Sequence, residues 1–266
     1  MEKKVVLITG CSSGIGRKLC MILKRKGYFV AASARELFRL DHLDADMKVM
    51  LDVSRPETIE NAVKEIIERS GRIDILVNNA GYSFRAAVEE IDLDEMKKMY
   101  DVNVYGIIRM MQAVLPYMRK QKCGKILNIG SVSGRLTGML NGSYCASKHA
   151  VEAITEAARY ELREFGISVT VVEPGAMDTD FFDTLEHNSE LQMKNTISPY
   201  HSLYQRDIKS RKRQKRASAE KSAERIAGII EKKRWKVRYT VSLPVIFSVL
   251  VRLPDRLKEV LILKFG

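Results

Sequence analysis

Cysteine and histidine are scarce in this chain, which has 4 of each among its 266 residues. The cysteines show no C-x-x-C spacing and have no histidine cluster beside them, so the sequence predicts neither a disulfide framework nor a metal site. Unpaired thiols are typical of a reducing compartment, and we therefore expect a cytoplasmic protein. The four cysteines are Cys11, Cys20, Cys123 and Cys145.

Long hydrophobic runs are also missing. The first apolar run, Val5–Thr9, is too short for a signal-peptide core or a membrane span, so it predicts a buried strand. The apolar tail, residues 241–266, is interrupted by Pro244, Arg252 and Pro254 and is too broken to cross a bilayer. We expect the tail to form an oligomer contact or to associate peripherally with a membrane.

Acidic residues are fewer than basic ones, 33 against 45, which gives a net charge of +12. Such an excess favours anionic partners: a phosphorylated cofactor, an acidic lipid surface or nucleic acid. Much of it lies in the run Lys209–Arg216, although basic runs are most often solvated surface. The run has no interleaved aromatic residues and no recognisable nucleic-acid motif, so we expect no nucleic-acid partner.

Short apolar runs alternate with longer amphipathic ones over residues 1–240. Continuous apolar strands separated by helices indicate a parallel sheet covered on both faces. Right-handed crossovers then predict an α/β fold: a single-domain, Rossmann-like, doubly wound parallel sheet. Strands are expected near Val5–Thr9, Phe29–Ser33, Lys48–Leu51, Ile73–Val77, Lys125–Ile129, Ser168–Val172 and Lys236–Thr240. Helices are expected near Ile15–Lys26, Pro56–Arg69, Leu93–Arg119, Tyr144–Phe165 and Ala219–Lys233.

Two segments depart from this regular alternation. Pro116 lies inside the helical pattern Leu93–Arg119 and is expected to kink or end that helix. The segment 178–217 is weakly periodic and longer than an ordinary connection, so we expect a substrate loop or lid there. The organisation predicted is a cofactor-binding and catalytic domain over residues 1–240, followed by the tail.

A glycine-rich turn joins the first strand to the first helix: Thr9-Gly10-Cys11-Ser12-Ser13-Gly14-Ile15-Gly16. Glycines let the backbone turn tightly and approach a ligand, and a helix N-terminus offers free N–H groups to a pyrophosphate. The spacing departs from G-x-G-x-x-G, so the general dinucleotide fingerprint is met in part. We interpret the turn as a dinucleotide site rather than a purely structural turn.

Further polar residues follow the other strands. Arg35 ends the second strand where an arginine accommodates the 2′-phosphate of NADP(H), and Glu36 beside it is expected to face away. A plain surface role for Arg35 remains an alternative. Asp52 follows the third strand and could bond the adenine edge. The run Asn78–Gly81 follows the fourth strand, where ligands bind in such sheets.

Tyr144 and Lys148 are four residues apart in Tyr144-Cys-Ala-Ser-Lys148 and therefore share one helix face. A cation beside a phenol favours the phenolate, so we expect Lys148 to lower the pKa of Tyr144. The pair then suits proton exchange with a carbonyl or alcohol oxygen. By itself the spacing is also common on ordinary amphipathic helices.

Together these motifs resemble the short-chain dehydrogenase/reductase family over roughly residues 3 to 182. The resemblance rests on ordered features: the Thr9–Gly16 turn, Asn78-Asn79-Ala80-Gly81, Asn103, Ser131, Tyr144-x-x-x-Lys148 and Pro174-Gly175. The turn and the Tyr144–Lys148 motif look like the branch that contains 17β-hydroxysteroid dehydrogenases, retinol dehydrogenases and acyl-dihydroxyacetone-phosphate reductases.

The resemblance implies a role for each matching residue. Tyr144 would be the general acid in reduction and the base in oxidation, with Lys148 lowering its pKa and bonding the nicotinamide ribose. Ser131 would hold the substrate oxygen, and Asn103 would hold a water that links Lys148 to solvent. The implied cofactor contacts are Gly10, Ser12, Ser13, Gly14, Ile15 and Gly16 at the pyrophosphate, Asn79, Ala80 and Gly81 near the adenosine ribose, and Pro174, Gly175 and Thr179 at the nicotinamide.

The sequence thus predicts an NADP(H)-dependent oxidoreductase that interconverts a carbonyl and an alcohol. The resemblance implies an apolar substrate, steroid-, retinoid- or lipid-like, and a homodimer or homotetramer built through the helices of Leu93–Arg119 and Tyr144–Phe165. An alternative is a non-catalytic NADP(H)-binding sensor or scaffold, which the complete Asn/Ser/Tyr/Lys set disfavours.

Overall fold

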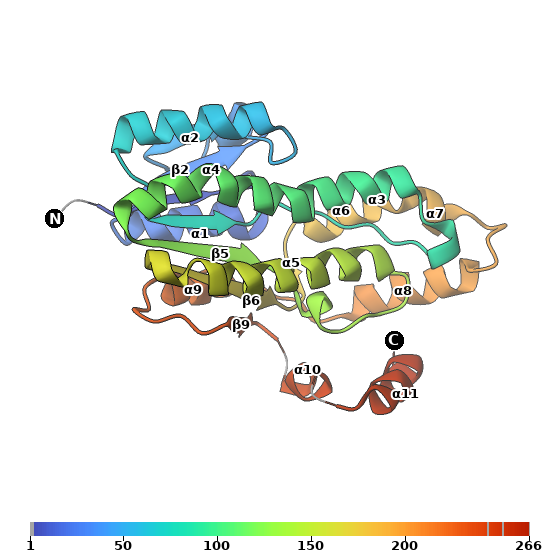
Figure 1. Ribbon diagram of the computed structural model, residues 1–266. Helices are drawn as coiled ribbons and strands as arrows, with labels where there is room; N and C mark the ends of the chain where they lie inside the picture. The colour runs from blue at the N-terminus through green and yellow to red at the C-terminus, as the bar shows by residue number, and fades with distance from the viewer. Residues whose placement is uncertain (1–2, 244, 252, 266) are drawn as a thin grey trace.

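A seven-stranded parallel sheet forms the centre of the protein, with the strand order β3-β2-β1-β4-β5-β6-β9 (Figure 1). The computed structural model describes residues 3–243, 245–251 and 253–265. The strands are β1 (Val5–Ile8), β2 (Phe29–Ala34), β3 (Met47–Met50), β4 (Ile75–Asn78), β5 (Gly124–Ile129), β6 (Ile167–Pro174) and β9 (Arg238–Val241). The order reverses between β1 and β4, which confirms the doubly wound α/β prediction.

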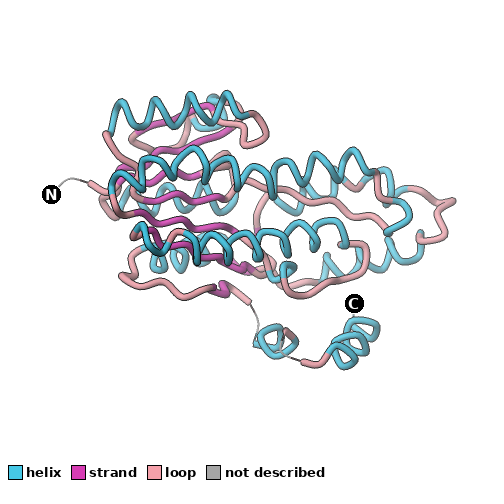
Figure 2. The backbone as a smooth tube through the Cα atoms, viewed as in Figure 1, coloured by secondary structure: helices cyan, strands magenta, loops and turns pink. Residues whose placement is uncertain are grey.

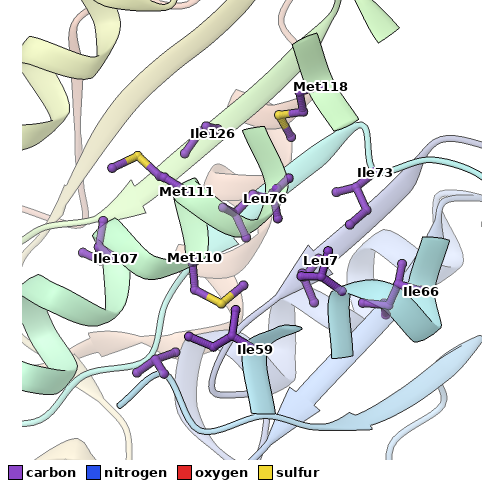
Figure 3. Packing of buried hydrophobic residues seen from close by; sticks show 14 of the residues in the cluster. Leu7, Ile59, Ile66, Ile73, Leu76, Ile107, Met110, Met111, Met118 and Ile126 are labelled. Carbon is purple, nitrogen blue, oxygen red and sulfur yellow. The ribbon is translucent and has the colours of Figure 1, made fainter. Parts of the chain in front are cut away.

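Helices cover both faces of the sheet, as Figure 2 shows. One face packs against α2 (Pro56–Ser70), α4 (Gly106–Gln121) and α5 (Gly142–Glu161), and the other against α1 (Gly14–Arg25) and α9 (Ala219–Ile230). The inner strands β1 and β4 are wholly buried, which explains why they read as apolar runs, whereas the edge strands β3 and β9 are partly exposed. Figure 3 shows the hydrophobic core on the face covered by α2, α4 and α5, which includes Leu7 and Leu76 of the sheet and Met110 and Met111 of α4.

The predicted helix Leu93–Arg119 is interrupted, but not at the proline. Helix α3 (Leu93–Tyr100) continues into a π-helical turn, η3 (Asp101–Tyr105), and then into α4, which passes through Pro116 to Gln121. Of the two outcomes expected at Pro116, a kink or the end of the helix, the end is therefore wrong. Pro116 is exposed, so water can satisfy the carbonyl that loses its N–H partner, and buried neighbours such as Met118 hold α4 on the sheet.

The segment 178–217 is a layer of helices rather than a loop. It contains α6 (Phe181–Asn188), α7 (Glu190–Lys194) and α8 (His201–Arg213), between the short paired strands β7 (Met177–Asp178) and β8 (Ala217–Ser218). Buried apolar side chains anchor the layer to the body, and they gather in one cluster: Ala87, Leu140, Leu185, Met193 and Tyr204. The Tyr204 hydroxyl also accepts from the Ala87 N–H at 2.9 Å and donates to Glu90 at 2.7 Å.

The remaining elements are short. The 3-10 turns are η1 (Leu37–Leu40), η2 (Val88–Glu90), η4 (Val132–Gly134) and η5 (Arg163–Phe165), and the chain ends in α10 (Val245–Leu250) and α11 (Asp255–Phe265). In Figure 1 the last two helices stand apart from the sheet.

The predicted tail begins inside the sheet. Val241, its first residue, is buried as the last residue of β9 and pairs with Pro174, so the sheet extends one residue beyond the predicted boundary. Pro244 and Arg252, which we expected to interrupt the tail, lie outside the described residues. Over the part of the chain that the structure describes, no helix is both long and apolar enough to cross a membrane.

Candidate active site

Tyr144, Lys148 and Ser131 meet near the carboxyl ends of the strands. Tyr144 and Lys148 lie on adjacent turns of α5, and Ser131 follows β5. A hydrogen bond with the Ser131 hydroxyl works to lower the pKa of the Tyr144 phenol, and the same hydroxyl accepts from the Ser133 N–H at 3.1 Å. The structure therefore brings the predicted proton donor and the predicted substrate clamp together.

Asn103 lies in the π-helical turn η3, which widens the helix at this point. Its Oδ1 accepts from the Tyr82 N–H at 3.0 Å, and its Nδ2 donates to the Tyr82 carbonyl at 2.9 Å and to the Ser147 hydroxyl at 3.2 Å. A Cβ added at Gly81 would lie 3.0 Å from Asn103 Oδ1 and 3.8 Å from Lys148 Nζ. Asn103 and Lys148 thus both lie close to Gly81, and the water expected between Asn103 and Lys148 stays a prediction.

The pKa of Tyr144 differs from the sequence-based expectation. Burial raises the pKa of the phenol to about 12, while the hydrogen bond with Ser131 and the charge of Arg85 act against this rise. Lys148 was expected to dominate, but its Nζ lies 5.7 Å from the centroid of the Tyr144 ring and donates to the Ile129 carbonyl at 2.8 Å. In this arrangement Tyr144 keeps its proton at neutral pH, as a proton donor must.

Lys148 has an acidic neighbour one turn further along α5. Burial lowers the pKa of Lys148 to about 8, and the negative charge of Glu152 opposes this fall. Burial and the nearby Glu173 raise the pKa of Glu152 from 4.5 to about 7, although Arg238 donates to Glu152 at 3.4 Å. A buried pair of carboxylates, Glu152 and Glu173, therefore lies behind the predicted catalytic lysine.

This carboxylate makes the stability of the protein depend on pH. Because the folded-state pKa of Glu152 lies above its usual value, the folded chain holds the proton more tightly than the unfolded chain. Its contribution to stability is complete below pH 4.5 and is lost as the pH rises through about 7. Replacing Glu152 with glutamine, which cannot ionise, should therefore raise the melting temperature more at pH 8 than at pH 5, measured by thermal unfolding.

Glu156→Gln is the matched control, because Glu156 lies on the same helix and accepts from the Tyr160 hydroxyl at 2.6 Å near the surface. Its effect on melting temperature should be the same at both pH values. A Glu152→Gln effect that does not change with pH would contradict the assignment.

The glycine turn is held by its neighbour strand rather than by its own residues. The Asn79 and Ala80 N–H groups donate to the Thr9 hydroxyl at 2.9 and 3.0 Å, and Asn79 Nδ2 donates to the Thr9 and Gly10 carbonyls at 2.9 and 3.0 Å. A Cβ at Gly16 would run into the Gly10 carbonyl oxygen and lie 2.5 Å from Asn79 Nδ2. Asn79 is thus largely occupied in shaping the turn.

The start of α1 suits a phosphorylated ligand. Ser13 precedes the helix in an extended conformation and makes no side-chain cap, so the first N–H groups stay available. A pocket of about 290 Å³ opens beside Ser13 and Gly14, and Arg17, Lys18 and Thr179 line it too. Asp178 and Asp180 also line the pocket, so its side chains carry both signs of charge. The free N–H groups of the uncapped helix start fit a pyrophosphate, and a nicotinamide cofactor bound there would supply or accept hydride.

The other predicted cofactor residues lie at neighbouring strand ends. Arg35 is exposed after β2, while Glu36 pairs with Arg39 at 2.6 Å. Asp52 follows β3 and accepts from the Ser54 N–H at 2.9 Å and its hydroxyl at 2.6 Å. Pro174 ends β6, and the Gly175 N–H donates to the Val241 carbonyl at 3.0 Å.

Sequence reasoning missed four residues near the site. Glu152 could have been found, because it follows Lys148 at helical spacing. Arg17 and Lys18 follow the glycine turn directly and could also have been inferred. Arg85 gives no local signal, because its position depends on the contact between the loop after β4 and the layer α6–α8.

Comparison with known proteins agrees with this geometry. Residues 4–190 match the family model described as short chain dehydrogenase. The chain is 37% identical over 195 residues to a 3-ketodihydrosphingosine reductase of Bacteroides thetaiotaomicron, which covers 73% of this chain and 71% of that protein. A short-chain dehydrogenase from Streptomyces avermitilis superposes with a TM-score of 0.83 at 31% identity, over 97% of this chain and 94% of that one. ElxO with NADP bound gives a TM-score of 0.73 at 26% identity, over 90% and 97%.

The chain belongs to the short-chain dehydrogenase/reductase family. It is an oxidoreductase that acts on a carbonyl or alcohol with a nicotinamide dinucleotide cofactor. These comparisons extend to the family and do not single out the 17β-hydroxysteroid and retinol dehydrogenase branch.

Proposed function

We propose that this protein is an NADP(H)-dependent reductase of a lipid-like ketone. The observation that carries the proposal is the buried phenol of Tyr144, whose pKa a hydrogen bond with Ser131 works to lower and whose ring centroid lies 5.7 Å from Lys148 Nζ. In reduction the carbonyl oxygen gains negative charge as hydride arrives at carbon. The Ser131 hydroxyl stabilises that charge and Tyr144 transfers its proton to it. Burial keeps Tyr144 protonated, which is the state that a proton donor needs in reduction.

Charge supports NADP(H) as the cofactor. Arg35 is exposed where a 2′-phosphate would lie, and Glu36, the residue that would repel the phosphate, is paired with Arg39. The similar protein ElxO has NADP bound.

Apolar side chains around Tyr144 support a lipid-like substrate. Tyr144 packs with Phe84, Ala86 and Met99, and the ring of Phe181 lies 5.9 Å from it between centroids. A relative with 37% identity is a 3-ketodihydrosphingosine reductase, whose name indicates a long-chain ketone. Steroid and retinoid ketones, the substrates implied by the resemblance to that branch, are included among the proposed substrates.

We extend the proposal to the setting of the enzyme. The protein is cytoplasmic in this proposal and associates peripherally with a membrane. The exposed apolar side chains of Leu257, Val260 and Leu263 on α11 support this association. A homodimer or homotetramer through α4 and α5 accords with the family resemblance.

The proposal is tested by following NADPH absorbance across steroid, retinoid, acyl-ketone and sugar carbonyls. We expect turnover of an apolar ketone, with a higher kcat/KM for NADPH than for NADH. Arg35→Ala should lower kcat/KM for NADPH by roughly 10- to 100-fold, because a charge-assisted hydrogen bond contributes about 1.5–3 kcal/mol. The value for NADH should stay nearly constant.

Arg69→Ala, on the exposed end of α2, removes the same charge away from the crevice and should change neither cofactor. If no carbonyl is reduced with either cofactor, the reductase proposal is rejected. If Arg35→Ala weakens both cofactors equally, the assignment of Arg35 to the 2′-phosphate is rejected.

A further inference from the structure

Arg85 is a buried cation close to the proposed proton donor, and the reaction described above does not use it. It follows the Asn78–Gly81 run at the end of β4, and its side chain is 14% exposed. Its Nε and Nη1 atoms are buried and have no hydrogen-bond partner within the described part of the chain. Burying a polar donor without a partner costs free energy, so such groups usually have a functional reason.

The nearest carboxylate only partly compensates Arg85. Asp207 Oδ1, on α8, lies 4.0 Å from Arg85 Nε, which is too long for a hydrogen bond. The other oxygen of Asp207 accepts from Arg211 Nε at 2.7 Å, so the two guanidinium groups share one carboxylate. Glu186 is the second partner of Arg211, at 3.2 Å. Arg85 therefore has the weaker share of the negative charge.

Arg85 acts on the reacting centre. Its positive charge works against the raised pKa of Tyr144, and the Tyr144 phenol in turn acts on the Arg85 guanidinium, whose pKa burial lowers. Phe84 and Ala86, on either side of Arg85 in the chain, pack in the apolar cluster of Tyr144. One cation with unpartnered donors thus lies next, along the chain, to two members of the apolar cluster that contains Tyr144.

We propose that Arg85 binds a carboxylate of the substrate, so that the physiological substrate is a lipid-like keto acid rather than a neutral ketone. A planar guanidinium matches a carboxylate with two parallel N–H···O bonds, and one arginine balances one negative charge. The substrate carboxylate takes the place beside Arg85 that Asp207 fills incompletely. The apolar chain then lies along Phe84 and Phe181, and the ketone reaches Tyr144. This inference rests on the proposed reductase function.

The test compares γ- and δ-keto fatty acids with their methyl esters, which keep the ketone but lose the charge. Wild-type enzyme should have a higher kcat/KM for the acid than for its ester. Arg85→Met keeps the side-chain volume and should lower kcat/KM for the acid by roughly 100-fold, because bonds to charged groups are the strong ones. The value for the ester should fall far less, because the ester loses only the effect of the Arg85 charge on Tyr144. Arg85→Lys keeps the positive charge but cannot form two parallel hydrogen bonds, so its kcat/KM for the acid should lie between the values of the wild type and Arg85→Met.

Arg206→Met is the matched control, because Arg206 is exposed on α8 next to Asp207. It should leave both substrates unchanged. Equal losses for acid and ester in Arg85→Met would mean that Arg85 acts only through Tyr144 or through packing, which rejects the carboxylate site, and a wild-type preference for the esters would overturn the proposal outright. In both cases ester turnover shows that the reductase function itself stands. If the wild-type enzyme reduces no carbonyl with either cofactor, the reductase function fails and this inference fails with it.

Discussion

Replacing Tyr144 with phenylalanine is expected to lower kcat for ketone reduction by roughly 1,000-fold, within the range that general acid catalysis contributes. The hydroxyl is the proposed proton donor, and burial raises its pKa to about 12, so it carries its proton at neutral pH. Phenylalanine has no hydroxyl and therefore cannot supply that proton. Phenylalanine keeps the ring that packs against Met99 and Phe181. Cofactor binding should therefore persist, measured by fluorescence titration of NADPH beside single-turnover hydride transfer.

Tyr100→Phe provides the matched control. Tyr100 lies on α3 at the edge of the same apolar cluster, and its hydroxyl is not part of the reacting centre. Tyr100→Phe also removes one hydroxyl oxygen, and its turnover should stay close to that of the wild type. A Tyr144→Phe enzyme with wild-type turnover would refute the proposed mechanism.

Gly16→Ala should weaken NADPH binding about tenfold or more, because each 1.4 kcal/mol of distortion in the turn is a factor of ten in Kd. The added Cβ would meet the Gly10 carbonyl oxygen and lie 2.5 Å from Asn79 Nδ2. Neither atom can yield easily, since Asn79 Nδ2 itself bonds that carbonyl at 3.0 Å. We also expect a loss of about 1–3 kcal/mol in folding stability, typical of overpacking, measured by denaturant unfolding.

Gly228→Ala makes the same chemical change on α9, where an added Cβ meets nothing within 4 Å. It should stabilise the fold by about 0.5–1 kcal/mol, because glycine is a poor helix former, and should leave NADPH affinity unchanged. If Gly16→Ala binds NADPH as tightly as wild type does, the glycine turn does not hold the cofactor in the way we describe.

The fold was predictable because its signals are local. Parallel strands are buried on both faces, so β1 reads as an unbroken apolar run and β4 as an apolar run up to Asn78, whatever their partners are. The helices between them show the complementary amphipathic pattern. The wrong expectation, that Pro116 ends its helix, came from applying a local rule where packing of the buried face of α4 decides the outcome.

The layer 178–217 was harder to predict for a related reason. Its helices are short, and α8 carries few apolar residues on its own. Burial of Leu185, Met193 and Tyr204 against the body stabilises them, and that surface comes from distant parts of the chain. Local periodicity therefore indicated a loop or lid.

By itself the sequence determined which chemistry is available: a phenol and a lysine on one helix face, a serine and an asparagine to serve them, and a glycine turn for the cofactor. Tertiary structure alone decided how those groups behave. Burial raises the pKa of Tyr144 to about 12, and Lys148 turns toward the Ile129 carbonyl. The tertiary structure also buries Arg85 between two residues of the Tyr144 cluster, with its Nε and Nη1 atoms lacking hydrogen-bond partners in the described part of the chain. Burial and charge pairing depend on what surrounds a side chain in space, and that environment is assembled from segments far apart in the chain.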